Sequence, residues 1–129
     1  MKTLTLICGV PNAGKTTYSE RYENVIHFDN VRHRSIDEQF RNCDMLAAKA
    51  KGSVCVEGVY NSVKRRKEFL AAVRNKDAKK VCVWMDTPAE VCARRLGIGG
   101  AAMIVFSHFK NFEEPTKEEG WDEIIRIKY

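Results

Sequence analysis

A glycine-rich loop follows the first apolar stretch of the chain. Residues 9–17 have the sequence GVPNAGKTT and come directly after the apolar run TLTLIC. Gly9 to Thr16 match the pattern G-x-x-x-x-G-K-[ST], whose glycines let consecutive backbone N–H groups point at a phosphate chain. In this pattern the lysine, Lys15, reaches the β- and γ-phosphates and the Thr16 hydroxyl ligates Mg²⁺. The loop therefore predicts that ATP and Mg²⁺ bind here; the expected nucleotide contacts are Gly9, Asn12, Ala13, Gly14, Lys15, Thr16 and Thr17.

A second pair of candidate residues follows the apolar run NVIHF. Asp29 and Arg32 stand three residues apart in the segment HFDNVRHR. Ligands of open α/β sheets bind at the carboxyl ends of the strands. There a carboxylate can take a proton from a hydroxyl, and an arginine can hold an anionic acceptor with two hydrogen bonds. Asp29 as a helix N-cap and Arg32 as a solvated helix residue explain the same residues equally well.

Strand-like and helix-like segments alternate along the whole chain. The short β-branched runs predict strands at Thr3–Cys8, Asn24–Phe28, Ser53–Glu57, Lys80–Met85 and Glu123–Tyr129. Helices are expected from Lys15 onward, over Ile36–Lys51, over Ser62–Lys76 and over Pro88–Leu96. The inner strands are apolar almost without alternation, which is typical of a parallel sheet that is buried on both faces. We expect an α/β fold with a mostly parallel sheet of about five strands and helices on both faces, forming one domain over residues 1–129.

Composition narrows the setting of the protein. The chain has 129 residues and a formal net charge of +5, which favours a polyanionic partner but is equally consistent with a solvated basic surface. No apolar run approaches the length of a membrane span, and the apolar start is too short for a signal peptide. The five cysteines lack C-x-x-C spacing, which indicates reduced, structural thiols. We therefore expect a cytoplasmic protein with no membrane association.

Several segments together resemble the P-loop polynucleotide 5′-hydroxyl kinases, both the phage enzyme and the kinase module of the animal kinase-phosphatase. The segments are GVPNAGKTT, FDNVRHR, SVCVEGVYNSVKRRKEF, VWMDTPAEVCARRL and FEEPTKEEGWDEIIRI. The resemblance implies that Asp29 is the general base for a 5′-hydroxyl and that Arg32 holds a phosphate of the acceptor. It also implies that Arg95 or Arg94 closes over the ATP phosphates.

The chain departs from this family at two places. Where members often end the third strand with Asp followed by Thr or Asn, this chain has Glu57-Gly58-Val59, and we expect Glu57 to take the metal-side role. The family's lid carries a second arginine, whereas LGIGG follows Arg95 here, so a cation from Lys64, Arg65 or Arg66 is a possible substitute. Tyr60 is a candidate for stacking on an acceptor base, and Arg65 for contacting the acceptor backbone.

Three functions remain open at this level. The main hypothesis is transfer of the ATP γ-phosphate to a 5′-hydroxyl end of DNA or RNA, with nucleic acid as the partner. The first alternative is a small-molecule kinase acting on a sugar, a nucleoside or an antibiotic. The second is a nucleotide-binding module without transfer activity.

Overall fold

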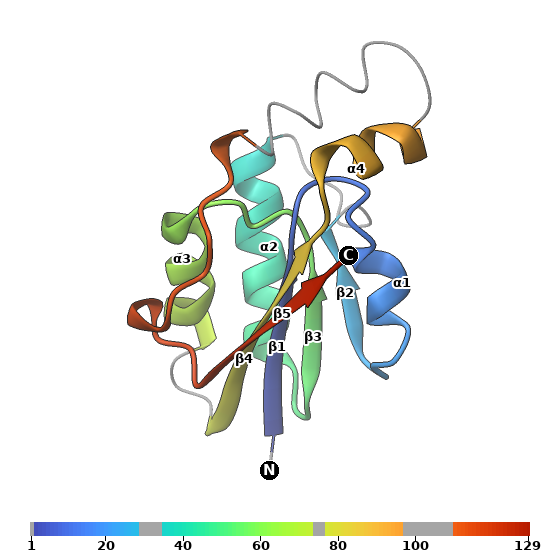
Figure 1. Ribbon diagram of the computed structural model, residues 1–129. Helices are drawn as coiled ribbons and strands as arrows, with labels where there is room; N and C mark the ends of the chain where they lie inside the picture. The colour runs from blue at the N-terminus through green and yellow to red at the C-terminus, as the bar shows by residue number, and fades with distance from the viewer. Residues whose placement is uncertain (1, 29–34, 74–76, 97–109) are drawn as a thin grey trace.

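The computed structural model describes residues 2–28, 35–73, 77–96 and 110–129. Five strands form one sheet in the order β2-β3-β1-β4-β5, and all four pairings are parallel. The central strand β1 (Lys2–Cys8) lies between β3 (Val54–Glu57) and β4 (Ala78–Asp86), with β2 (Val25–His27) and β5 (Glu123–Lys128) at the edges. The carboxyl ends of all five strands therefore meet at one edge of the sheet (Figure 1).

Helices cover both faces of the sheet. On one face, α2 (Ile36–Lys49) and α3 (Val63–Val73) pack on strand residues such as Leu6. On the other face lie α1 (Lys15–Ser19) and α4 (Ala89–Leu96). Successive strand residues point to opposite faces, so Leu4, Leu6 and Cys8 join the first core while Ile7, Val81 and Val83 join the second. This arrangement confirms the predicted α/β fold with a parallel five-stranded sheet.

The charged segment before β5 is more ordered than a plain turn. It contains a short 3-10 helix, η2 (Lys117–Glu119), whose first turn is closed by a reciprocal capping box between Thr116 and Glu119. Trp121 follows it and is buried, so it anchors the tail. The segment thereby fixes where β5 enters the sheet.

A buried ion pair joins this segment to α3. The side chain of Arg66 is fully buried, and its Nε donates to Glu119 Oε1 over 2.8 Å. The guanidinium also donates to the backbone carbonyls of Tyr60 and Glu113, each over 2.7 Å, and Trp121 Nε1 donates to Glu119 Oε1 over 3.0 Å. Burial by itself raises the pKa of Glu119, but the bonds from Arg66 and Trp121 outweigh it and lower that pKa below its usual value. We refer to Arg66, Glu113, Glu119 and Trp121 as the tail cluster.

The cysteines agree with the expectation from composition. All five are buried and none is in a disulfide, as predicted for structural thiols. In the part of the chain that the structure describes, no helix is long and apolar enough to cross a membrane.

Candidate nucleotide-binding site

The glycine-rich loop crosses the carboxyl edge of the sheet between β1 and α1. A Cβ atom at Gly9 would lie 3.1 Å from the carbonyl oxygen of Met85 on β4, so only glycine lets the loop pass this close. Gly14 has φ of 100° and caps α1 at its N-terminus, a left-handed conformation that glycine adopts without strain. Thr87 Oγ1 donates to the carbonyl of Ala13 over 2.7 Å, which ties the loop to the end of β4.

Lys15 points back into the loop that precedes it. Its Nζ donates to the carbonyls of Gly9 over 2.9 Å and of Val10 over 2.8 Å, and the residue is 7% exposed. These acceptors are neutral, and ionised acceptors make bonds to an ammonium about twice as strong. A bond from Lys15 to a phosphate oxygen would therefore be stronger than either of these two bonds.

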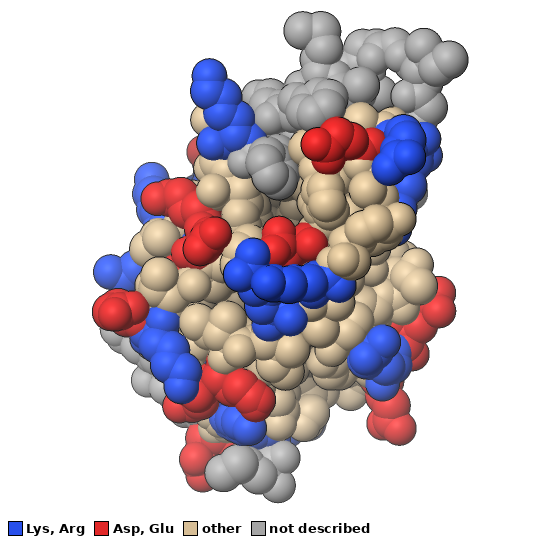
Figure 2. All heavy atoms as spheres, in the orientation of Figure 1, with Lys and Arg blue, Asp and Glu red and all other residues tan. Residues whose placement is uncertain are grey.

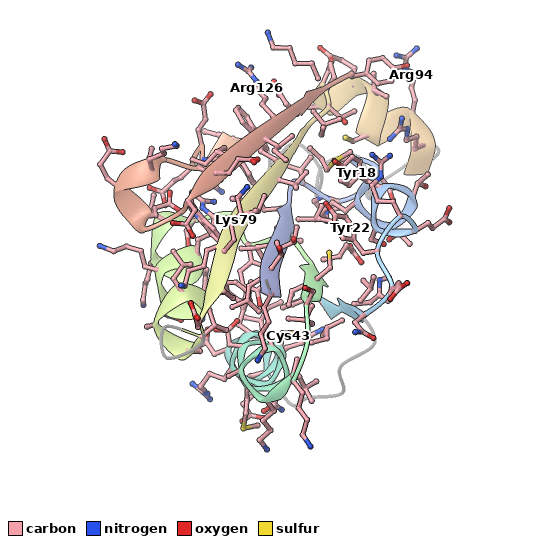
Figure 3. All side chains as sticks on the ribbon, turned by 90° about the horizontal axis from the view of Figure 1, so that it is seen from below. Tyr18, Tyr22, Cys43, Lys79, Arg94 and Arg126 are labelled. Atoms are coloured by element: carbon pink, nitrogen blue, oxygen red, sulfur yellow. The ribbon has the colours of Figure 1, made fainter. Side chains whose placement is uncertain are left out.

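The loop forms one wall of a pocket of about 640 Å³. This volume is within the usual range of small-molecule sites. The walls come from the loop, from α1, and from the carboxyl ends of β3, β4 and β5, as well as from Phe28 and Arg95. In Figure 3, Tyr18 lies between α1 and α4, and it is one of the lining residues. Six of the seven predicted nucleotide contacts line the pocket, namely Asn12, Ala13, Gly14, Lys15, Thr16 and Thr17. Gly9 is not one of the lining residues, but its carbonyl accepts a hydrogen bond from Lys15 Nζ.

The structure separates the two arginines at the end of α4. Arg95 lines the pocket; its Nη1 donates to the Asn12 carbonyl over 2.9 Å, and its guanidinium lies 5.7 Å from the ring centre of Tyr129. Arg94 is exposed and bonds the Glu90 carbonyl of its own helix, and Figure 3 shows it projecting from the outer side of α4. Of the two candidates, Arg95 is therefore the one that the fold brings to the loop, and Arg94 does not line the pocket.

The residues present fit a magnesium ion bound together with a nucleotide. Thr16 is exposed and lines the pocket, and Glu57, at the end of β3, lines the same pocket with a nearly buried side chain. Among the described residues, no group of three or more His, Cys, Asp or Glu could hold a metal ion by itself. Such an open donor set suits Mg²⁺, which keeps several waters and takes one or two protein ligands plus phosphate oxygens.

The prediction that Tyr60 stacks on an acceptor base is wrong. Its side chain is fully buried, with the ring edge-on to Phe40 and Phe69, and its hydroxyl donates to Asp44 Oδ1 over 2.8 Å. The apolar core between β3 and α2 accounts for this position, because an aromatic ring there buries far more surface than it would beside the loop.

The basic run at residues 64–67 is not a continuous cationic surface either. Arg66 belongs to the tail cluster, and Arg65 pairs with Asp37 and Glu68 while its guanidinium lies over the Phe40 ring. Arg65 lines a separate groove between α2 and α3 and is absent from the walls of the nucleotide pocket. The predicted acceptor contact by Arg65 is therefore not supported. On the face shown in Figure 2, Lys and Arg are interspersed with Asp and Glu.

Asp29 and Arg32, the predicted base and acceptor clamp, lie outside the described residues. The residue before Asp29, Phe28, lines the nucleotide pocket. The catalytic assignments of Asp29 and Arg32 stay predictions from the sequence.

Sequence patterns missed several pocket residues. Thr87, Lys128 and Tyr129 line the pocket from the ends of β4 and β5, and Tyr18 and Arg21 line it from α1 and the turn after it. The rule that ligands bind at the carboxyl ends of parallel strands pointed to the first three. Arg21 lies over the Tyr18 ring, with its Cζ 3.7 Å from the ring centre. Only the i, i+3 spacing of the two residues indicated this contact in the sequence.

Several known families and solved structures are similar to this chain. A family model described as an AAA domain matches residues 4–98. No curated protein sequence gives a significant match. A gluconokinase from Sinorhizobium meliloti 1021 superposes with a TM-score of 0.77 at 13% identity, covering 98% of this chain and 82% of that one.

Two further solved structures share the fold. Chaetomium thermophilum Kti12 in complex with ADP-AlF3 has a TM-score of 0.76 at 14% identity, with 98% of this chain and 89% of that chain covered. The Mycobacterium tuberculosis APS kinase CysC, in complex with AMPPNP and APS, has a TM-score of 0.67 at 15% identity, with 97% and 88% covered. At these identities the likeness establishes the P-loop kinase fold and leaves the acceptor open.

Proposed function

The chain belongs to the AAA-domain family, and from that premise we propose that it is an ATP-dependent phosphotransferase acting on a hydroxyl group. The observation that carries the proposal is the position of Lys15, which is nearly buried and lines the pocket at the start of α1, directly after the glycine-rich loop. Together with Arg95 across the loop, it supplies positive charge where β- and γ-phosphate oxygens need it. Thr16 and Glu57 would hold Mg²⁺, which would neutralise further charge on the same phosphates.

We favour a small molecule as the acceptor. Two of the three residues expected to contact a nucleic acid, Tyr60 and Arg65, do not reach the pocket. The acceptor side that remains is formed by Phe28, Glu57, Gly58 and Val59. Fold neighbours such as the gluconokinase carry small-molecule kinase names, which supports this choice by analogy only.

A nucleic-acid 5′-hydroxyl end is the second candidate. The Asp29 and Arg32 spacing and the formal charge of +5 favour it. Under either candidate, Asp29 is the proposed base that takes the hydroxyl proton. Under the second candidate alone, Arg32 is the proposed clamp on a phosphate of the acceptor.

The test is a transfer assay with γ-labelled ATP and Mg²⁺ on matched acceptors. The panel contains sugars, nucleosides, nucleoside 3′-phosphates and 5′-hydroxyl oligonucleotides, with Lys15→Ala as the inactive control. We expect label on a small acceptor, with nucleosides and their 3′-phosphates used equally. A strong preference for 3′-phosphates and oligonucleotides that disappears in Arg32→Ala would favour the second candidate instead. Binding of ATP without transfer to any acceptor would contradict phosphotransferase activity and indicate a nucleotide-binding module.

A further inference from the structure

His27 and Glu57 lie side by side where β2 and β3 end. They are direct partners in the parallel register of the two strands. His27 Nδ1 and Glu57 Oε2 are 2.7 Å apart, with the His27 side chain 31% exposed and that of Glu57 9% exposed. Glu57 lines the nucleotide pocket, whereas His27 is not among the residues that line it. The histidine therefore reaches the pocket only through the glutamate.

The carboxylate of Glu57 needs a hydrogen-bond partner to hold it in one orientation. A glutamate has one more side-chain torsion than an aspartate, and fixing such a side chain costs up to about 1.5–2 kcal/mol in rotamer entropy. The residue after it, Gly58, has no side chain to hold the carboxylate. The bond to His27 is the one side-chain hydrogen bond described for Glu57. It also directs one carboxylate oxygen toward β2, and no hydrogen bond to the other is described for the residues that the structure places.

We propose that His27 is a positioning residue that fixes the Glu57 carboxylate for its work on the magnesium side of the pocket. This proposal rests on the proposed function, because it gives Glu57 its role beside Thr16 and the phosphates. It explains how the long side chain of Glu57, followed by Gly58, keeps an oriented carboxylate at the end of β3. Outer partners of this type usually change metal affinity or activity by about 10–100-fold when removed.

Two substitutions of His27 separate positioning from general stability. In His27→Asn the amide nitrogen takes the place of Nδ1 and can still donate to Glu57, whereas in His27→Gln it lies near the position of Nε2. The matched control is Asn24→Ala, which removes the Asn24 Nδ2 bond to the Ser53 carbonyl, 3.2 Å long, at the opposite end of the same strand pair.

The readout is the gain in ATP affinity that Mg²⁺ confers, measured as the ratio of dissociation constants in EDTA and in Mg²⁺, together with Tm. We expect His27→Gln to lose this gain by about 10-fold or more. His27→Asn should keep the gain within about 2-fold. Affinity in EDTA should stay at the wild-type value in both variants, and Asn24→Ala should change Tm alone.

Several results would overturn the proposal. One is an equal Mg²⁺-dependent gain in His27→Gln and the wild type. Another is a loss of ATP affinity in His27→Gln that is equally large in EDTA and in Mg²⁺, because the effect would then not involve the metal. A wild-type protein that binds ATP equally in Mg²⁺ and in EDTA would overturn it too. Intact Mg²⁺-dependent binding with no transfer to any acceptor contradicts only the proposed function.

Discussion

The tail cluster and the nucleotide pocket each contain a buried cation, and only the cation of the pocket, Lys15, lines the space where a ligand can bind. Arg66 in the tail cluster bonds the carboxylate of Glu119 as well as two backbone carbonyls. The bonds described for Lys15 run to the carbonyls of its own loop, and Arg95 bonds the carbonyl of Asn12. A cation that pairs with a carboxylate away from the pocket stabilises the fold. Cations that line a pocket beside a glycine-rich loop are placed to receive an anionic ligand.

The tail cluster also explains part of the sequence resemblance to the polynucleotide kinases. The segment FEEPTKEEGWDEIIRI resembles the end of the polynucleotide kinase module, and it contains Glu113, Glu119 and Trp121. In the structure these residues hold Arg66 and fix the entry of β5. The segment is therefore explained by packing and does not indicate which acceptor the protein uses.

The largest effect is expected from substitution of the proposed general base, Asp29. Asp29→Asn should lower the transfer rate roughly 10²–10⁴-fold, because an amide cannot accept the hydroxyl proton. Tm and ATP affinity should hold, since Asn caps a helix about as well as Asp. Rates, Tm and ATP binding measured on the one variant check this. Transfer at near wild-type speed would remove Asp29 from the mechanism.

The opposite pattern is expected for the tail cluster. Arg66→Ala leaves the Glu119 carboxylate buried without its cation and should lower the free energy of unfolding by about 3–5 kcal/mol. Chemical denaturation checks this, with the exposed neighbour in Lys67→Ala as a control that should shift it by less than about 0.5 kcal/mol. Equal stability of the two variants would mean that the ion pair is not the anchor of the tail.

Asp44 offers a third case, a buried carboxylate whose described partner is the Tyr60 hydroxyl rather than a cation. Burial raises the pKa of Asp44 from its ordinary 3.8 to about 6; the Tyr60 bond opposes this rise and nearby Glu68 adds to it. Because the folded pKa lies above the unfolded one, the contribution of Asp44 to stability is full below pH 4 and is lost as pH rises through 6. Asp44→Asn should stabilise the protein at pH 7.5 by about 2–3 kcal/mol, an upper figure from the size of the shift.

The pH dependence supplies the control for that prediction. Unfolding curves of the wild type and Asp44→Asn at pH 3.5 should nearly coincide, since Asp44 is protonated in both states there. A difference between the two proteins that stays constant from pH 3.5 to 7.5 would show that the charge of Asp44 is not its cause.

The smallest effect is expected from loss of the single hydrogen bond that joins Thr87 to the glycine-rich loop. Thr87→Val removes the bond to the Ala13 carbonyl while keeping the shape of the side chain, and should cost about 1 kcal/mol in unfolding free energy. ATP affinity should fall only a few-fold, because Lys15 and Arg95 stay in place. Calorimetry on this variant checks it, and a loss of ATP binding as large as that of Lys15→Ala would assign Thr87 a direct contact.

Local patterns were enough to predict the elements and the loop. The apolar runs gave all five strands, and the spacing of Gly9, Gly14 and Lys15 placed the phosphate loop between β1 and α1. The sequence failed where the outcome depended on packing between distant segments. Tyr60 and Arg65 follow β3 closely in the sequence. Their side chains nevertheless contact α2, Tyr60 at Asp44 and Arg65 at Phe40, and do not line the pocket. Nothing in the local sequence marks Arg66 as buried, because its partner Glu119 is 53 residues away.

The most direct test of the central claim compares the affinities of ATP, ADP and AMP for the wild type and Lys15→Ala in Mg²⁺. If Lys15 receives the β- and γ-phosphates, the wild type should bind ATP far more tightly than AMP. Lys15→Ala should then lose about 10–150-fold in ATP affinity, the equivalent of one bond to a charged group, and most of its preference for the triphosphate. Its Tm should fall modestly, because the carbonyls of Gly9 and Val10 lose their donor. Equal ATP affinity in the wild type and Lys15→Ala, or equal binding of ATP and AMP by the wild type, would contradict the assignment of this loop as the triphosphate site.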